Sequence, residues 1–250
     1  MGDDLGDGLW EELAVRLADM ARTLLSQETV QDTLDQIVRH AVTLVGGCEQ
    51  AGILVVEGRR EVRTLAATSE LVHASDQLQE EVGQGPCFDA TRRKNEVFRI
   101  ADMNASLHRW PKYAPRARRL GIGSVMGFLL FTEDDNLGAL DMYSTRRRAF
   151  TERSERVGWL LASHAAVALS SARTHAQLGE ALETRNEIGE ALGIVMERYK
   201  LTEEQAFTVL RRSSQERNVK LRDIARTVAR TGEIPGAAGG PPGPGVTAGA

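Results

Sequence analysis

The stretch that decides the fold of the C-terminal part of the chain is residues 183–230, ETRNEIGEALGIVMERYKLTEEQAFTVLRRSSQERNVKLRDIARTVAR. It holds three amphipathic segments with almost no loop between them, because apolar residues recur at helical spacing in each. The first segment stops near Tyr199, and the second breaks near Asn218. The sequence TEEQ at 202–205 is a capping box, in which Thr202 and Gln205 bond each other's backbone N–H and start the second helix. Three such helices predict one small all-α core.

The side chains expected inside this bundle are apolar and lie on one face of each helix. They are Ile188, Val195, Phe207, Leu210, Ile224 and Val228.

The polar faces of the bundle are basic. Residues 211–230 contain seven Lys or Arg and two acids, a net charge of 7 − 2 = +5 in a chain of net charge −4. A local basic surface on an acidic protein favours a polyanionic partner, although a solvated helix face explains the same charges equally well. The cations expected on the exposed faces, where they could contact such a partner, are Arg185, Arg198, Lys200, Arg211, Arg212, Lys220 and Arg222.

These residues resemble the ANTAR domain, the three-helix RNA-binding module of bacterial transcription antiterminators. The resemblance is carried by Arg185, Ile188, Ala191, Gly193, MER at 196–198, LTEEQAF at 201–207, Leu210-Arg211 and KLRDIA at 220–225. It implies that residues 173–231 bind paired hairpin loops in nascent RNA and so prevent a terminator from forming. One position departs from the family, which usually has Lys where this chain has Leu192.

Length and composition limit the remaining possibilities. A chain of 250 residues, 42% hydrophobic and 26% charged, can form two small domains with a real core. No stretch approaches eighteen consecutive apolar residues, and the acidic N-terminus lacks the features of a secretory signal. Two cysteines, Cys48 and Cys87, make neither a disulfide framework nor a metal site. We therefore expect a cytoplasmic protein that does not enter the membrane.

The first two thirds of the chain predict an α+β domain. Helical patterns occur at 9–25, 29–45, 69–81 and 110–120, and strand patterns at 50–57, 61–68, 96–100, 124–131 and 137–143. This order fits an antiparallel sheet with helices packed on it. Residues 151–198 contain no proline and predict one long connecting helix, or two stacked end to end.

Residues 28–172 resemble a GAF domain of the type that precedes ANTAR in actinobacterial proteins. The motifs are Asp35, Ile37-Val38, AGI at 51–53, LAAT at 65–68, GPCFDA at 85–90, RWP at 109–111, GAL at 138–140 and the helix 162–169. The resemblance implies a sensor but names no ligand, so the cofactor stays unknown. Residues 1–27 form a separate amphipathic helix in this interpretation. Residues 232–250, rich in Gly, Pro and Ala, form a disordered tail.

Three residues are candidates for a sensor pocket: Cys87, Phe88 and Trp110. Cys87 follows GQGP at 83–86, where a pocket mouth would lie in a GAF fold, so a small-molecule contact or a redox role is one hypothesis. The alternative is a small buried apolar side chain. Trp110 is a core residue or part of a ligand platform.

The sequence offers no catalytic constellation, so we expect a regulator and not an enzyme. The five histidines are scattered and have no ligand partner three or four residues away, and Asp134-Asp135 lie in an acidic loop. Two other functions fit the bundle. Its second and third helices could mimic a DNA-binding helix-turn-helix, or its apolar faces could bind a partner helix as an adaptor.

Two apolar seams predict a parallel homodimer. One is the stripe on the first helix, and the other lies on the helix at 151–198. The stripe consists of Leu9, Leu13, Leu17, Met20 and Leu24.

Overall fold

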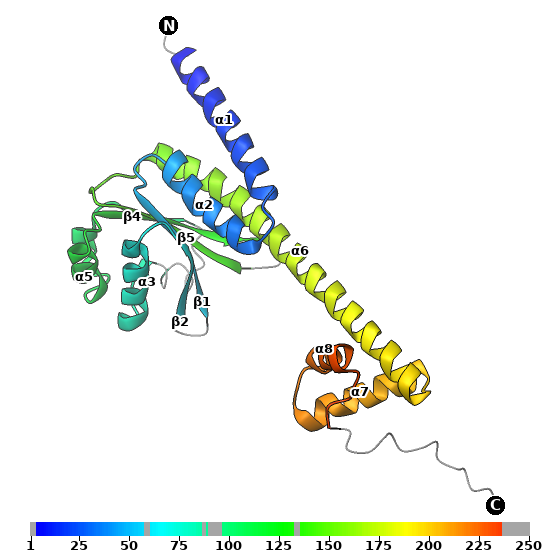
Figure 1. Ribbon diagram of the computed structural model, residues 1–250. Helices are drawn as coiled ribbons and strands as arrows, with labels where there is room; N and C mark the ends of the chain where they lie inside the picture. The colour runs from blue at the N-terminus through cyan, green and yellow to red at the C-terminus, as the bar shows by residue number, and fades with distance from the viewer. Residues whose placement is uncertain (1–3, 58–60, 87–88, 90–96, 133–135, 237–250) are drawn as a thin grey trace, which may run out of the picture. The chain divides into compact units, whose positions relative to one another are not determined.

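The computed structural model describes residues 4–57, 61–86, 89, 97–132 and 136–236, and divides into two compact units, Met1–Ala176 and Gln177–Ala250. The helices of the first unit are α1 (Asp4–Leu25), α2 (Val30–Leu44), α3 (Glu70–Val82), the 3-10 turn η1 (Met103–Ser106) and α5 (Tyr113–Arg119) (Figure 1). Its strands are β1 (Gln50–Glu57), β2 (Glu61–Ala67), β3 (Val97–Ile100), β4 (Ser124–Phe131) and β5 (Asn136–Ser144). Helix α6 (Glu152–Tyr199) continues into the second unit, which adds α7 (Glu203–Arg217) and α8 (Leu221–Thr231).

The five strands form one antiparallel sheet in the order β2-β1-β5-β4-β3. On the central strand β5, Leu140 pairs with Ile53 of β1 and with Phe128 of β4, so these three side chains share a face. Tyr143 pairs with Val125 and points to the other face. The sheet is therefore buried on both sides.

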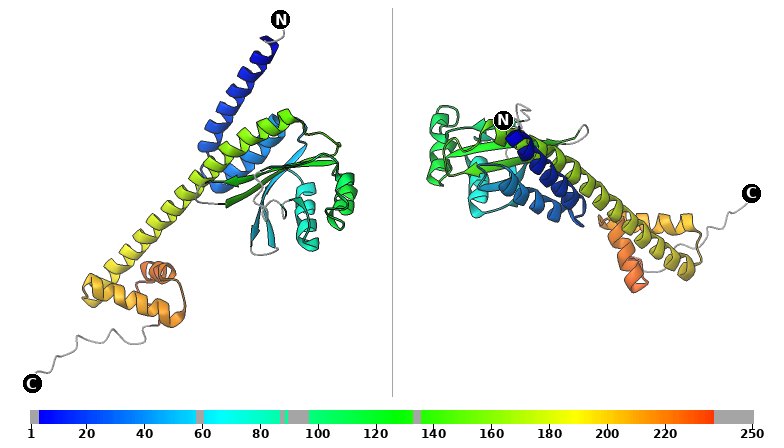
Figure 2. Two further views of the ribbon diagram at one scale, coloured as in Figure 1. Left: turned by 180° about the vertical axis from the view of Figure 1, so that it is seen from behind. Right: turned by 90° about the horizontal axis from the view of Figure 1, so that it is seen from above.

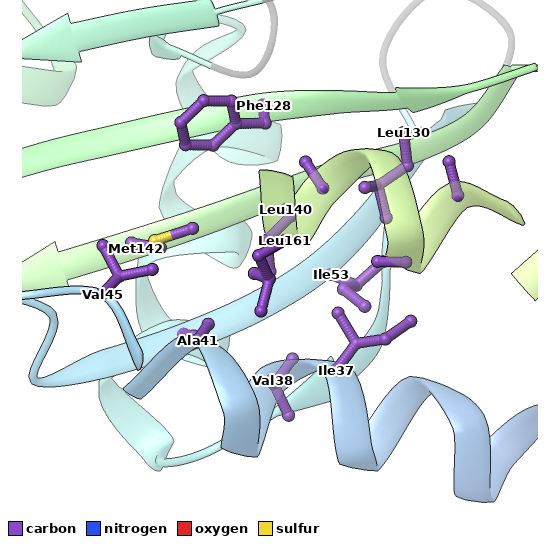
Figure 3. Packing of buried hydrophobic residues seen from close by; sticks show 14 of the residues in the cluster. Ile37, Val38, Ala41, Val45, Ile53, Phe128, Leu130, Leu140, Met142 and Leu161 are labelled. Carbon is purple, nitrogen blue, oxygen red and sulfur yellow. The ribbon is translucent and has the colours of Figure 1, made fainter. Parts of the chain in front are cut away.

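Helices cover each face of this sheet (Figures 1 and 2). Helix α2 and the first part of α6 pack on the face that carries Leu140, where Ile37 and Leu161 meet the strand side chains in the largest core (Figure 3). The apolar side chains of α1 belong to the same core. Helices α3 and α5 cover the opposite face, where Val72 and Tyr113 are fully buried. This is the expected α+β sensor fold, and the long segment after it is a single helix of 48 residues.

Helix α1 has the amphipathic pattern expected, but its apolar face has a different partner. Leu13, Leu17, Met20 and Leu24 are buried in the same core as α2 and the sheet of their own chain. This part of the proposed dimer seam is therefore wrong, because burial within the chain leaves those side chains no surface for a second copy. The side chain of Leu9 is outside the described residues.

The second unit is the expected three-helix bundle. Thr202 starts α7 with both bonds of the capping box, and α7 ends at Asn218 in the left-handed conformation with φ of 51°. The core residues come from all three helices. They are Ala191, Val195, Ala206, Leu210, Ile224, Ala225, Val228 and Ile234, with Ile188 partly buried against them.

Two expectations for the bundle need correction. Phe207 is 39% exposed, because Ala206 and Leu210 fill the buried face of α7. The tail does not begin at Gly232, since Ile234 is buried in the bundle core and the Ser213 hydroxyl donates to the Pro235 carbonyl at 2.7 Å. Residues 237–250, also assigned to the tail, lie outside the described residues.

Among the described helices, none combines the length and the apolar character that crossing a membrane requires.

Candidate nucleic-acid interface

The outer face of α7 presents an aromatic ring beside a cation. Phe207 and Arg211 are four residues apart, so they are neighbours on the helix surface, and both are exposed. Sequence reasoning placed Phe207 in the core because a helix with apolar residues at 206, 207 and 210 leaves the inward face ambiguous. An exposed ring next to a guanidinium can stack on an unpaired base while the cation holds its phosphate.

Three of the seven candidate cations are open to a ligand. Arg185 on α6, Arg211 on α7 and Lys220 before α8 are exposed, and within the described part of the chain they form no ion pair. Their positive charges are therefore available to phosphates.

The other four cations are engaged within the second unit. Arg222 forms an ion pair with Glu180 of α6, and Arg198 donates to the Gly232 carbonyl at 2.5 Å, which ties α6 to the end of α8. The pairs of Lys200 with Glu197 and of Arg212 with Glu216 join residues three or four apart and are exposed. Exposed local pairs of this kind contribute little and exchange readily with solvent or a ligand.

Arg226 belongs to the same cation set, although sequence reasoning did not single it out. Its Nε donates to the Glu187 Oε1 at 2.8 Å, and this bond, with the charge of the same carboxylate, raises the pKa of Arg226. The signal in the sequence was its spacing of four residues from Arg222, which places both arginines on one side of α8.

Leu192 is half-buried and packs against the bundle core. Its side chain therefore serves packing at the position where the ANTAR resemblance led us to expect a lysine.

The sensor-pocket candidates are only partly within the described chain. Trp110 is 2% exposed, and its Nε1 donates to Asp89 Oδ2 at 3.3 Å. Its ring packs edge-on against the ring of Tyr113, with 6.2 Å between the ring centroids. These contacts make Trp110 a core residue between α5 and the segment holding Asp89. Cys87 and Phe88 lie outside the described residues, so their role stays a prediction.

A buried polar cluster lies between the sheet and α3. Asp76 of α3 accepts from the Thr64 hydroxyl at 2.7 Å and from the Tyr143 hydroxyl at 3.5 Å, and it is 2% exposed. Burial and the nearby charge of Asp141 raise the pKa of Asp76 to about 8. Sequence patterns gave no sign of this cluster, because its members come from separate strands and helices. They are Thr64, Ser75, Asp76, Tyr113, Asp141 and Tyr143.

The remaining candidates for chemistry are the metal-ligating and thiol side chains of the described chain. No group of three or more His, Cys, Asp or Glu within it could hold a metal ion. Cys48 is buried, which raises the pKa of its thiol to about 12, so this thiol is a poor nucleophile.

Two family models match the chain. The model described as a GAF domain matches residues 27–170, and the model described as an ANTAR domain matches residues 176–228. A comparison with curated proteins finds no match.

Solved structures that resemble the chain share its sheet and helices. The GAF domain of a phosphoenolpyruvate-protein phosphotransferase from Coxiella burnetii has a TM-score of 0.51 at 19% identity, over 66% of this chain and 96% of that one. Its counterpart from Acinetobacter has a TM-score of 0.50 at 13% identity, over 64% and 94%. Free methionine-R-sulfoxide reductase from Neisseria meningitidis, solved with its substrate, has a TM-score of 0.51 at 16% identity, over 66% and 93%. At these identities the likeness concerns the fold alone.

Proposed function

Because the chain belongs to the GAF domain family over residues 27–170 and carries an ANTAR domain at residues 176–228, we propose that it is a transcription antitermination regulator. Its C-terminal bundle binds hairpin loops in nascent RNA, and its GAF domain alters that binding in response to a small-molecule or redox signal. A protein that binds nascent RNA works where transcription takes place, so we propose a cytoplasmic location. We assign it no catalytic role.

The observation that carries this proposal is the outer surface of the bundle. Arg185, Arg211 and Lys220 are exposed without an ion-pair partner in the described chain, and Phe207 adds a stacking surface beside Arg211. RNA loops are held by this combination of cations on phosphates and rings on unpaired bases.

We also propose that two copies of the chain pair through α6. Leu160, Val167, Leu178 and Leu182 are 44–62% exposed and recur at spacings of seven, eleven and four residues, so they follow one side of the helix. A homodimer brings two bundles together, one for each hairpin of a paired target.

The experiment that tests RNA binding removes two adjacent cations of α7. Arg211→Ala with Arg212→Ala should weaken binding of a labelled RNA hairpin and flatten its dependence on salt, by roughly 0.7–0.9 in log–log slope for each phosphate that the protein no longer neutralises. Helicity and melting should stay nearly unchanged, because exposed charges contribute little stability.

The matched control is Arg118→Ala with Arg119→Ala, which removes two adjacent exposed arginines from the GAF domain. This control should keep the wild-type affinity. Equal affinity in both double variants would favour the adaptor function, in which the basic residues are dispensable. Tighter binding to duplex DNA than to hairpin RNA of equal charge would favour a DNA-binding regulator.

A further inference from the structure

One side of α6 carries acids that face the arginines of α8. Glu180, Glu183 and Glu187 are three and four residues apart, so they share one side of α6. Arg222 pairs with Glu180, and four residues later Arg226 pairs with Glu187 at 2.8 Å. Both contacts lie within the second unit. We call the three glutamates the acidic stripe.

The Glu187 pair is the more protected of the two. The Glu187 side chain is 19% exposed. Its Oε1 accepts from Nε and Nη2 of Arg226, each at 2.8 Å. Its Oε2 is buried without a hydrogen bond among the described residues. Removing the arginine would leave a largely buried carboxylate without its partner, which costs far more than losing an exposed pair. The Arg226 side chain is 60% exposed, but its Nε and Nη2 contact Glu187 and its Nη1 lies 3.9 Å from Asp223, so a carboxylate lies beside each of its nitrogens.

A phosphate and a glutamate carboxylate compete for the same guanidinium geometry, since each accepts parallel N–H bonds from arginine. A phosphate that binds Arg222 or Arg226 must therefore displace the acidic stripe. The exposed cations Arg185, Arg211 and Lys220 have no such competitor within the described chain.

We propose that the acidic stripe occupies Arg222 and Arg226 in place of RNA phosphates and so restrains RNA binding by the bundle. This inference rests on the proposed RNA binding. The stripe lies on the same continuous helix that leaves the GAF domain, so a signal that shifts α6 against α8 would free two further cations.

The test compares two double variants of the full chain that change the net charge equally. Glu180→Gln with Glu187→Gln removes the acidic-stripe partner of each arginine and leaves Arg226 its exposed pair with Asp223 at 3.9 Å. The control, Glu190→Gln with Glu204→Gln, neutralises two exposed glutamates that form no ion pair in the described chain. Binding of a labelled RNA hairpin is measured over a series of salt concentrations.

The stripe variant should bind RNA about tenfold more tightly than the control, and its log–log salt slope should be steeper by roughly 0.7–0.9 for each arginine that gains a phosphate. Adding Arg222→Gln and Arg226→Gln to the stripe variant should return the affinity to that of the wild type. The single variant Glu180→Gln keeps the buried Glu187 pair and should therefore keep the fold. Its log–log salt slope should change by about half as much as that of the double variant.

Equal affinity and equal slope in the stripe variant and the control would overturn the inference while leaving RNA binding in place. An absence of RNA binding by the wild type and by every variant would instead overturn the proposed function, and the inference with it.

Discussion

Asp76 is a carboxyl group that the fold buries beside Asp141, and its pKa is raised to about 8. An unfolded aspartate has a pKa of about 3.9, so between about pH 4 and 8 the folded protein keeps a proton that the unfolded chain has lost. The contribution of Asp76 to stability is therefore complete below about pH 4 and declines as the pH rises toward 8.

Asp76→Asn should remove this pH dependence while keeping an acceptor for the Thr64 hydroxyl. Between pH 5 and 8 the free energy of unfolding of the wild type should fall relative to the variant, by at most about 1.4 kcal/mol per pH unit. Urea denaturation at several pH values measures this difference. Glu28→Gln, which removes an exposed carboxylate, is the control. Parallel curves for wild type and Asp76→Asn would show that Asp76 does not hold the proton.

Phe207→Ala should weaken RNA binding and leave the fold intact. Truncation of a fully buried aromatic side chain to Ala would lower the free energy of unfolding by about 3–5 kcal/mol. Because the Phe207 ring is 39% exposed, we expect the free energy of unfolding to fall by about 1 kcal/mol or less. Loss of one stacked base should lower RNA affinity by roughly fivefold to a hundredfold. Leu120→Ala, equally exposed but in the GAF domain, should change neither quantity much. A large loss of thermal stability with unchanged RNA affinity would return Phe207 to a packing role.

At the residue scale, the sequence predicted which side chains carry charge, but not which of them are paired or buried in the fold. The candidate cations were found from charge alone, but four of the seven have partners within the bundle. Arg222 meets Glu180 across 42 residues of sequence, a contact between helices that no local pattern contains. The burial of Asp76 beside Asp141 has the same origin.

At the scale of single elements, the start of α7 depends on one reciprocal contact. The Thr202 N–H donates to Gln205 Oε1 at 3.0 Å, and the Gln205 N–H donates to Thr202 Oγ1 at 3.4 Å. Thr202→Ala should therefore destabilise the bundle by about 1 kcal/mol, because the Gln205 N–H loses its acceptor. Thr208→Ala is the control, since its hydroxyl bonds the Glu204 carbonyl within the helix and caps nothing. Thermal unfolding should show a lower melting temperature for the first variant only, and equal shifts would argue against the cap.

Elements were predictable where local chemistry determines them. Capping at Thr202, the break at Asn218 and the apolar runs of β4 and β5 are written in short stretches of sequence. A short stretch of sequence does not show which element packs against an amphipathic face. The leucines of α1 were correctly seen as one apolar face, but their spacing is the same whether α2 or a second copy covers them.

At the scale of the whole molecule, the GAF domain and the C-terminal bundle share one helix, α6. Residues of α6 pack on the GAF sheet through Leu161 and Leu169, and further along the same helix Ala191 and Val195 form the bundle core. Glu180 and Glu187, which hold the arginines of α8, lie between these two packing sites along the sequence. Helix α6 therefore contributes side chains to the core of each unit.

The assembly prediction concerns the exposed side of this helix. Val167 is 62% exposed on α6, and two copies that bury Leu160, Val167 and Leu178 against each other would remove several large apolar side chains from water. Light scattering at micromolar concentration should give twice 27.3 kDa for the wild type. Val167→Glu should give 27.3 kDa, because it puts a charge in the seam. Ala176→Glu adds the same charge on the opposite side of α6 and should leave the dimer intact. A monomeric wild type, with or without RNA, would rule out this assembly and require that each chain reads its hairpin alone.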